Sequence, residues 1–466
     1  MFRIAPRRAW LAAALLTPCL TLASSQPASA ARKQAPEIPI EKFTLQNGLK
    51  VVLSEDHSAP VVTTYTTYRV GAAQEKKGFT GFAHLFEHMM FNGSRNVPEG
   101  AYAYYVDGTG GYLNGNTEPD RTNYFQTVPS NYLEGMLYLE SNRMANLIID
   151  ENSLSNEKDV VKEEVRQQQE NTPFSKTILL DWPAAAFSSW EYSHSIYGSM
   201  EDLSNAPVQA FKDFFAQYYV PNNATLVIVG DFDAKEARAL VEKYYGPLPR
   251  GPENTTEVPV EAEQTAAVYK EVKDPLAPVS LALISFDIPK PREADRDALE
   301  LLATILTDGA SARMTKRLVD DDKLASTVMM QAGFPIPTYG PGQLAALLVA
   351  ANGKQLSDVR AAFWDEIAKV QKKGVSASEL KRGKAKLYKD HVDGQQKTLF
   401  KAMQLATYET FYGGAELFNQ DVQRFEKIKV SDLKRVAKQY LTPARSVTFD
   451  IVPGASVDAA AMVPGK

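Results

Sequence analysis

A helix, a proline and a strand occur in the same order at two places that lie 222 residues apart. Residues 217–229 (QYYVPNNATLVIV) resemble residues 439–451 (QYLTPARSVTFDI): in each, a helix ends near a tyrosine, a proline breaks it and a strand follows. The alternative is chance, because this punctuation is common in proteins. A duplication predicts an α+β fold of two similar domains of roughly 200 residues, each a mostly antiparallel sheet covered by helices.

Turn residues indicate where the first sheet and the domain boundary lie. Residues 43–53 (FTLQNGLKVVL) alternate around an Asn-Gly dipeptide, which predicts a hairpin that opens a sheet. Residues 250–266 are polar, contain prolines and lack an apolar period, so they are the predicted linker. We therefore expect an N-terminal domain over 31–249 and a homologous C-terminal domain over 267–466.

The N-terminus is typical of a secretory signal peptide over residues 1–30. A basic MFRIAPRR segment precedes 15 apolar residues, and Ala28 and Ala30 suit signal peptidase. A membrane anchor is the alternative, but this apolar stretch is interrupted by Pro18 and short for a bilayer. Adjacent arginines leave a twin-arginine export route open. We expect a periplasmic protein, or a secreted one, without a membrane anchor after signal removal.

Composition narrows the possible chemistry of the mature chain. Cys19 is the one cysteine and lies in the leader, so the mature chain can form no disulfide, thiolate zinc site or cysteine nucleophile. Losing the three arginines of the leader changes the formal net charge from −5 to −8. An acidic chain without basic clusters argues against nucleic acid as a partner.

A short apolar segment carries histidines at metal-ligand spacing. In residues 81–93 (GFAHLFEHMMFNG), a helix that Thr80 can cap and that ends at Asn-Gly places His84 and His88 at i and i+4, on one face. Neutral imidazoles at this spacing suit Zn²⁺, and Glu87 on the flank can reach a metal-bound water. The order H-x-x-E-H is the inverse of the H-E-x-x-H zinc helix. The alternative is a pair of core histidines.

A catalytic zinc ion requires a third protein ligand, and an acidic helix offers one. This helix is expected to begin after Ser153 or Ser155 and to end before Pro173. Glu157 and Glu164 are seven residues apart, so they share one face of it. The alternative is that these glutamates form a solvated acidic face. The pair of histidines favours the ligand interpretation, because a zinc site would require a third ligand such as a carboxylate.

These segments resemble the pitrilysin/insulinase family of zinc peptidases, in which a ligand glutamate follows H-x-x-E-H by about 75 residues. Here 75 residues separate His88 from Glu164. The resemblance extends to QNGLKVVL, GGYLNGNTEPDRTNYF, VVKEEVRQ and residues 374–387 (GVSASELKRGKAKL). It is strongest to the short, two-domain bacterial members and to the catalytic subunit of mitochondrial processing peptidase.

The resemblance implies a zinc-dependent endopeptidase. His84, His88 and Glu164 would hold one Zn²⁺ per chain. Glu87 would take a proton from the attacking water and return it to the leaving amine. Glu157 occupies the position of an acidic residue that supports the site in this family.

A glycine-rich strand over residues 108–117, followed by a turn and a second strand over 121–128, lies between these motifs. Glycines in a strand permit close approach of another backbone, although they also occur in loosened internal strands. By resemblance, an extended peptide would pair with this strand. The predicted substrate-binding residues are Gly111, Tyr112, Leu113, Asn114, Gly115, Asn116 and Thr117.

One part of the family pattern is missing from the second half. Self-sufficient members carry an Arg and a Tyr there that grip the substrate. Matching Ser311 to the start of that motif places Val319 and Ser326 at the two positions, and a shift to Arg317 places Leu324 at the second. We therefore expect a heterodimer in which a homologous subunit without the zinc motif supplies the Arg and Tyr.

Other interpretations remain open. The chain could form a self-sufficient homodimer, or serve as a non-catalytic subunit that binds peptides, although erosion of the zinc set would then be expected. A zinc hydrolase of non-peptide substrates would use the same groups. His57, His194 and His391 lack ligand spacing and are expected to lie in loops or on the surface.

Overall fold

The computed structural model describes residues 36–454, and the first sheet begins at the N-terminal end of this range. The predicted signal peptide lies outside the described residues. Six strands follow the order β1-β2-β6-β3-β5-β4. Their bounds are β1 (Glu41–Thr44), β2 (Lys50–Glu55), β3 (Val61–Tyr68), β4 (Tyr112–Thr117), β5 (Thr122–Pro129) and β6 (Ala224–Gly230). β2 and β6 are parallel and all other neighbours are antiparallel, so the sheet is mostly antiparallel as expected.

The hairpin that opens this sheet is confirmed. β1 and β2 pair antiparallel with Phe43 opposite Val51. Gly48 in the turn has a φ of +92°, a conformation that side chains with a Cβ rarely adopt. A Cβ at Gly48 would also lie 2.6 Å from the Cβ of Asn222. Both constraints explain the glycine at this turn.

The second sheet repeats the topology of the first. Its order is β7-β11-β8-β10-β9, with β7 and β11 parallel and the other neighbours antiparallel. The bounds are β7 (Val268–Asp274), β8 (Leu281–Ile288), β9 (Ala325–Ala332), β10 (Gly342–Ala350) and β11 (Ser446–Pro453). Taken in chain order, β7, β8, β9, β10 and β11 correspond to β2, β3, β4, β5 and β6, and corresponding strands have the same neighbours in the two sheets.

The sequence repeat coincides with this structural repeat. α8 (Val208–Tyr218) leads through a short turn into β6, and α15 (Val430–Tyr440) leads through a similar turn into β11. The starts of both elements differ by 222 residues, which is the offset of the sequence match. No helix or strand lies between residues 246 and 267, where the linker is predicted. The domain limits themselves stay a prediction.

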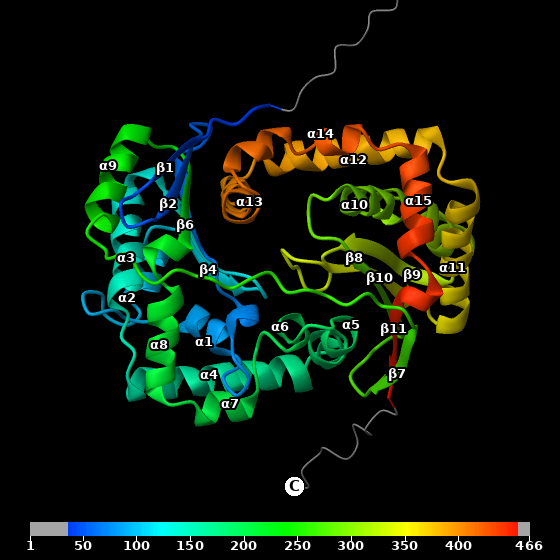
Figure 1. Cartoon of the computed structure of the whole chain (residues 1–466), viewed down its shortest axis with the longest axis horizontal. Coiled ribbons are helices and arrows are strands. Elements are labelled where there is room, and N and C mark those ends of the chain that lie inside the picture. The colour runs from blue at the N-terminus through cyan, green and yellow to red at the C-terminus, as the bar shows by residue number, and fades with distance from the viewer. Residues whose placement is uncertain (1–35, 455–466) are drawn as a thin grey trace, which may run out of the picture. The chain divides into compact units, whose positions relative to one another are not determined.

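Helices of the first half pack on one face of the first sheet (Figure 1). Besides α8 they are α1 (Phe82–Met89), α2 (Ala101–Gly108), α3 (Leu133–Asn146), α4 (Glu151–Glu170), α7 (Met200–Asn205) and α9 (Ala234–Tyr245). Val51 and Leu53 of β2 point into this core, whereas Val52 between them points to the other face, because side chains alternate along a strand.

The other face of the first sheet is covered by a helix of the second half, α13 (Thr398–Phe411) (Figure 1). Val52 belongs to the same buried cluster as Leu405 of this helix. Lys401 on α13 is buried and forms an ion pair with the partly exposed Asp56, next to the end of β2. The first sheet therefore cannot bury both faces with residues of its own half.

The second sheet shows the reciprocal arrangement. Its own helices on one face are α10 (Ala294–Thr307), α11 (Leu356–Lys373), α12 (Ala377–Gly394), α14 (Gln423–Glu426) and α15. The other face is covered by the segment of the first half that contains η3 (Thr177–Asp181), α5 (Pro183–Ala186) and α6 (Trp190–Ser193). Trp182 is fully buried there, and its indole N–H donates to Ser285 Oγ of β8 at 3.0 Å. The halves thus complete each other's cores, which the sequence did not predict.

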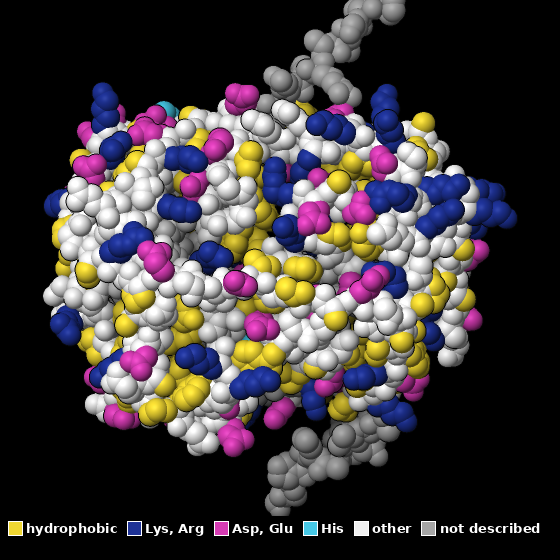
Figure 2. Space-filling view, in the orientation of Figure 1, with side chains coloured by type: hydrophobic (Ala, Val, Ile, Leu, Met, Phe, Trp, Pro, Cys, Tyr) yellow, Lys and Arg dark blue, Asp and Glu magenta, His cyan; other side chains and the backbone are white. Residues whose placement is uncertain are grey.

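The surface carries charges of both signs. Basic and acidic side chains are interspersed with hydrophobic ones across the face seen in Figure 2. Within residues 36–454, no helix combines the length and apolar character that a bilayer span requires.

Asp120 joins the two halves at the turn between β4 and β5. Its buried carboxylate accepts hydrogen bonds from the Tyr192 hydroxyl at 3.0 and 3.1 Å and from the Tyr339 amide at 2.8 Å. Burial outweighs these bonds and raises the pKa of Asp120 to about 6. The native state therefore retains a proton on Asp120 at pH values where the unfolded chain has lost it.

We expect Asp120→Asn to flatten the dependence of stability on pH. A raised native pKa contributes stability that is complete below the unfolded value near 4 and is lost as pH rises through about 6. The contribution lost is on the order of 2 kcal/mol. Urea unfolding at pH 4.5 and pH 7.5 measures it, as the difference between wild type and variant. An identical pH dependence in both proteins would contradict the prediction.

Candidate metal centre

The first part of the site is helix α1, which is short and buried. His84 and His88 lie one turn apart on it, and Phe82, Leu85 and Phe86 pack into the core. The prediction that Thr80 caps this helix is wrong. Gly81 is the N-cap, with a φ of +86°, and a Cβ there would lie 2.7 Å from a backbone carbonyl oxygen. The Thr80 hydroxyl instead donates to Asp202 of α7 at 2.6 Å.

The N-terminus of α1 is held by a buried carboxylate that the sequence analysis missed. Glu75 is fully buried and accepts from the amides of Gly81 and Ala83, both at 2.9 Å. His194 lies in the loop that follows α6, as predicted, and its Nε2 is 3.3 Å from the same carboxylate. Burial raises the pKa of Glu75, and the hydrogen bond from His194 opposes that rise. These two residues fix where α1 begins.

The three predicted metal ligands come together. The Nε2 atoms of His84 and His88 are 3.3 Å apart, and Glu164 Oε2 lies 3.0 Å from His88 Nε2 and 3.6 Å from His84 Nε2. Ligands about 2.0 to 2.1 Å from a tetrahedral zinc ion are separated by roughly 3.3 Å. The three separations bracket that value, so the donor set fits zinc. Among the described residues this is the one such group of histidine and acidic side chains.

The pKa values of the two histidines shift in opposite directions. Burial lowers the pKa of His88, but the hydrogen bond and charge of Glu164 outweigh burial and raise it. Burial, together with the neighbouring His88, lowers the pKa of His84 to about 4, so its imidazole is neutral near pH 7. The Nε2 atoms of the two imidazoles face each other at 3.3 Å, and a cation between them would be bound by both rings in the tautomer that leaves Nε2 unprotonated. The ring of Tyr197 packs edge-on against His84 and limits its rotation.

The second part of the site is helix α4. It begins earlier than expected, because Asp150 rather than Ser153 or Ser155 caps it, and Asp150 Oδ1 accepts from the Ser153 amide at 2.9 Å. It ends at Glu170, before Pro173, as predicted. α1 and α4 pack together, which brings Glu164 against the histidines.

Two acidic neighbours of the ligand have different environments on α4. The side chain of Glu163 is 69% exposed and pairs with Arg166 at 2.9 Å. Glu157, one heptad before Glu164, is 13% exposed. It accepts from Asn92 Nδ2 at 2.8 Å, and its Oε2 lies 3.8 Å from His88 Nδ1, the nitrogen that faces away from the metal position. Glu157 thus lies behind the imidazole of His88, where a carboxylate can orient the ring, and is itself held by Asn92, a contact that the sequence did not reveal.

Replacing Glu157 with glutamine is expected to weaken zinc binding by about 10- to 100-fold, because the carboxylate behind a ligating histidine orients the ring and raises its basicity. Titration of the metal-free protein with zinc against a chromophoric chelator measures the affinity. Asp159→Asn is the matched control, since Asp159 is 78% exposed on the same helix. Equal affinities in the two variants would show that Glu157 has no such role.

Glu87 lies beside the metal ligands but is not one of them. Its Oε2 accepts a hydrogen bond from Thr117 Oγ at 2.7 Å. Burial raises its pKa, and the Thr117 hydroxyl opposes that rise. A carboxylate with a raised pKa next to a metal is suited to accept a proton from water.

The glycine-rich strand is an edge strand that adjoins this carboxylate. β4 is the last strand of the first sheet and pairs with β5 alone, so the internal-strand alternative is excluded. A Cβ on Gly115 would lie 3.0 Å from Glu87 Cγ, which explains a glycine at this point of β4. The Gly115 amide donates to the side chain of Asn114 at 2.8 Å. Gly111 precedes the strand, and substrate binding by residues 111–117 stays a prediction.

Two further sets of residues from the sequence analysis lie elsewhere: the positions expected to grip substrate, and the two other histidines. Val319 packs against the second core, and Ser326 is an exposed residue of β9. His57 is exposed and its Nδ1 lies 2.7 Å from an Asp231 carboxylate oxygen. His391 is buried rather than exposed, and its Nε2 lies 3.0 Å from the side-chain amide nitrogen of Gln395.

Comparison with known proteins finds one family along most of the chain. The model described as Insulinase (Peptidase family M16) matches residues 50–199, and that of the Peptidase M16 inactive domain matches residues 205–387. The zinc protease PqqE of Helicobacter pylori is 27% identical over 430 residues, which cover 89% of this chain and 93% of that protein.

Two further comparisons agree. The probable mitochondrial-processing peptidase subunit beta of Arabidopsis thaliana is 23% identical over 422 residues, covering 87% of this chain and 77% of that protein. The crystal structure of a protease from Helicobacter pylori matches with a TM-score of 0.83 at 26% identity, over 89% of this chain and all of that one. This chain therefore shares its fold with a protease of known structure.

Proposed function

The chain belongs to peptidase family M16, and from that membership we propose that it is a zinc-dependent endopeptidase that hydrolyses extended peptides. One observation carries the proposal: ligand atoms of His84, His88 and Glu164 converge at 3.0 to 3.6 Å with Glu87 beside them. The names of the relatives support a zinc protease.

Each residue of the site has a separate task in this reaction. A zinc ion bound by His84, His88 and Glu164 would activate water and polarise a carbonyl group. Glu87 accepts the proton of the attacking water and delivers it to the leaving amine nitrogen. Thr117 holds the Glu87 carboxylate in place through its 2.7 Å hydrogen bond. Since Thr117 ends β4, the proton acceptor is tied to the strand that would bind the peptide.

The free edge of β4 supports binding of an extended substrate. An unpaired strand edge offers backbone donors and acceptors to another extended chain. At Gly115 that chain would replace the hydrogen bond that the amide now makes to Asn114. Side chains on both faces of the strand would then contact alternate residues of the peptide.

We further propose that the chain acts as the zinc-bearing subunit of a heterodimer in the periplasm. Val319 and Ser326 provide neither a cation nor a phenol at the positions where self-sufficient relatives are expected to grip substrate. An apolar valine cannot replace a charged hydrogen-bond donor. Native mass spectrometry of the endogenous protein tests the partnership, and a species containing this chain alone would leave the homodimer or monomer.

Hydrolysis of a long quenched-fluorescent peptide by the purified, zinc-loaded mature chain tests the activity. Cleavage that a chelator abolishes and zinc restores is the expected result, with a small ester as the comparison substrate. A zinc-loaded chain that cleaves the ester and not the peptide would overturn the proposal. Cleavage only after addition of extract from the source cell would support the peptidase and the missing partner together.

A further inference from the structure

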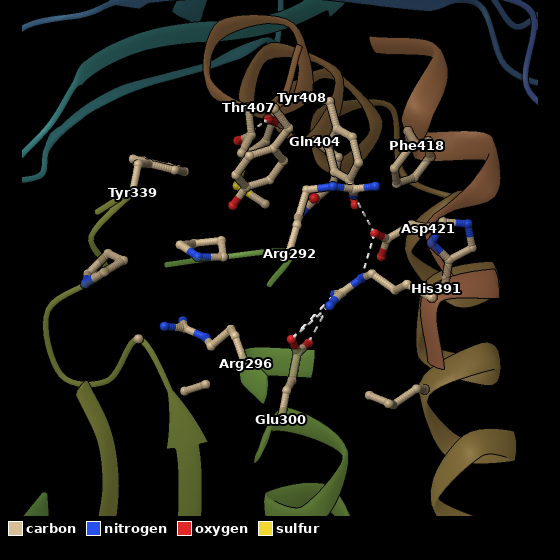
Figure 3. A pocket seen from close by; sticks show the side chains of 18 of the residues that line it. Arg292, Arg296, Glu300, Tyr339, His391, Gln404, Thr407, Tyr408, Phe418 and Asp421 are labelled. Atoms are coloured by element: carbon tan, nitrogen blue, oxygen red, sulfur yellow. Dashed lines mark hydrogen bonds and ion pairs between the residues drawn. The ribbon is translucent and has the colours of Figure 1, made fainter. Parts of the chain in front are cut away.

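A cavity that none of His84, His88 and Glu164 lines lies where α10, α12 and α13 approach the loop between β9 and β10 (Figure 3). Its volume is about 480 Å³. Arg121, Arg292, Arg296 and Arg424 line it, so its wall is rich in guanidinium groups. The side chains seen in Figure 3 come mostly from the second half of the chain.

Three of these arginines are neutralised by carboxylates. Arg121 makes two hydrogen bonds of 2.9 Å to Glu118. Arg292 and Arg424 each lie 2.9 Å from Asp421. Arg424 also pairs with further carboxylates, those of Asp297 and Glu300. Dashed lines in Figure 3 trace part of this network.

Arg296 is the exception. It is 6% exposed, and no carboxylate of the described residues lies within ion-pairing distance of it. Its one hydrogen bond runs from Nη1 to the Pro289 carbonyl oxygen at 3.2 Å. The guanidinium points into the cavity, where Figure 3 draws no interaction for it. Burial of this unpaired charge lowers the pKa of Arg296.

An unpaired buried guanidinium with free donors is costly in an empty site and favourable in one that holds an anion. The planar guanidinium fork matches a carboxylate, which can accept two parallel N–H bonds from it. The chemistry of the cavity therefore selects a carboxylate rather than a cation or an apolar group. The unused donors of Arg296 are the second observation, besides the cavity, that indicates a ligand.

The cavity adjoins the proposed peptide path. Thr117, at the end of β4, contacts Glu87, and the next residue, Glu118, pairs with Arg121 in the cavity wall. Arg121 Nη1 also donates to Thr407 of α13 at 2.6 Å, which connects the end of the substrate strand to the helix that forms this wall. The end of the strand that would bind the peptide is thus connected, through Glu118 and Arg121, to the wall of the cavity.

We propose that this cavity binds a carboxylate of the peptide substrate through Arg296, away from the metal centre. The proposal rests on the peptidase function proposed above and adds a substrate preference to it. The carboxylate can be the C-terminus of the peptide or the side chain of an Asp or Glu residue. Both sources share the chemistry that Arg296 recognises.

Gly333 offers a matched pair of variants. A Cβ at Gly333 would lie 3.3 Å from Arg296 Nη2, so Gly333→Asp supplies an internal carboxylate to Arg296. Gly333→Asn has the same shape without the charge. The φ of +79° at this position is one that Asp and Asn both tolerate better than most residues. Circular dichroism and a thermal melt verify folding, and the Asp variant is expected to be the more stable of the two.

Peptide binding is measured in the zinc-loaded Glu87→Gln background, so that no hydrolysis occurs. The probes are a fluorescein-labelled decapeptide of Ala, Leu and Ser with a free C-terminal carboxylate, its C-terminal amide, and the amide with one internal Glu. Fluorescence anisotropy should show that loss of the peptide carboxylate, Arg296→Met or Gly333→Asp each weakens binding by about 10- to 100-fold, whereas Gly333→Asn does not.

The three probes separate the sources of the carboxylate. Tight binding of the acid alone identifies the C-terminus, and equal tight binding of the acid and the Glu-containing amide identifies carboxylates in general. Equal binding of all three, equal binding by the two Gly333 variants, or no binding overturns the proposal. Peptide cleavage by the wild type without such discrimination would reject this site alone. Discrimination in binding without cleavage, even after addition of extract from the source cell, would reject the peptidase function alone.

Discussion

Zinc-loaded Glu87→Gln is expected to cleave a quenched peptide about 100 to 10,000 times more slowly than the wild type, with one zinc ion retained per chain. Proton transfer by a positioned side chain contributes a factor of this size, and glutamine cannot accept the proton. Zinc is retained because Glu87 is not among the converging ligand atoms. The amide can still accept the hydrogen bond from Thr117, so the end of β4 should keep its place.

The measurement is kcat with metal content determined on the same sample. Glu163→Gln is the control, since it makes the same substitution at an exposed position. Its rate should equal that of the wild type. A Glu87→Gln protein that retains full activity would show that another group accepts the proton, and one that loses its zinc would show that Glu87 belongs to the ligand set.

The grouping of His84, His88 and Glu164 could be predicted from the sequence because helical periodicity is local. Residues at i and i+4 share a face in any α-helix, and so do Glu157 and Glu164 at a spacing of seven. The internal repeat was equally informative, since the second copy of a fold follows from the same local pattern of helix, proline and strand. These predictions required no knowledge of which elements meet in space.

Residues that support the ligands could not be predicted, because their roles depend on contacts between distant segments. Glu75 holds α1 through the amides of Gly81 and Ala83, and His194 reaches it from more than 100 positions away. Asn92 was expected only to end a helix, yet it fixes Glu157. The sequence did contain one indication of such a residue. Gly81, which precedes α1, has no side chain to cap the helix, so the first amides of α1 require an acceptor from elsewhere.

Each half covers one face of the other half's sheet, and this exchange connects the candidate metal centre to the second half. α4 carries Glu157 and Glu164, and the chain that follows it leads to Trp182, which is buried beneath the second sheet. In return, Leu405 of α13 completes the core of the first sheet. The second half therefore stabilises the half that carries His84, His88 and Glu164, although among the described residues it adds none to this group.

Glu164→Gln is expected to lower zinc affinity by roughly 100-fold or more, since even the loss of a group behind a ligand costs 10- to 100-fold. Glutamine keeps the size of the side chain but offers a neutral amide oxygen, a weaker partner for a dication than a carboxylate. Zinc titration against a chromophoric chelator measures the change. Activity at saturating zinc should remain low, because the ion is then held mainly by His84 and His88.

Glu163→Gln provides the comparison for this variant, one residue away on the same helix and with the same chemistry. Its zinc affinity should be that of the wild type, because its carboxylate pairs with Arg166 and not with the histidines.

Zinc at 100 times the dissociation constant of the wild type stabilises the native state by about 2.7 kcal/mol. At that zinc concentration, wild type and Glu163→Gln should show the full stabilisation in urea unfolding, and Glu164→Gln less than about 0.5 kcal/mol. Equal stabilisation of all three proteins would remove Glu164 from the ligand set.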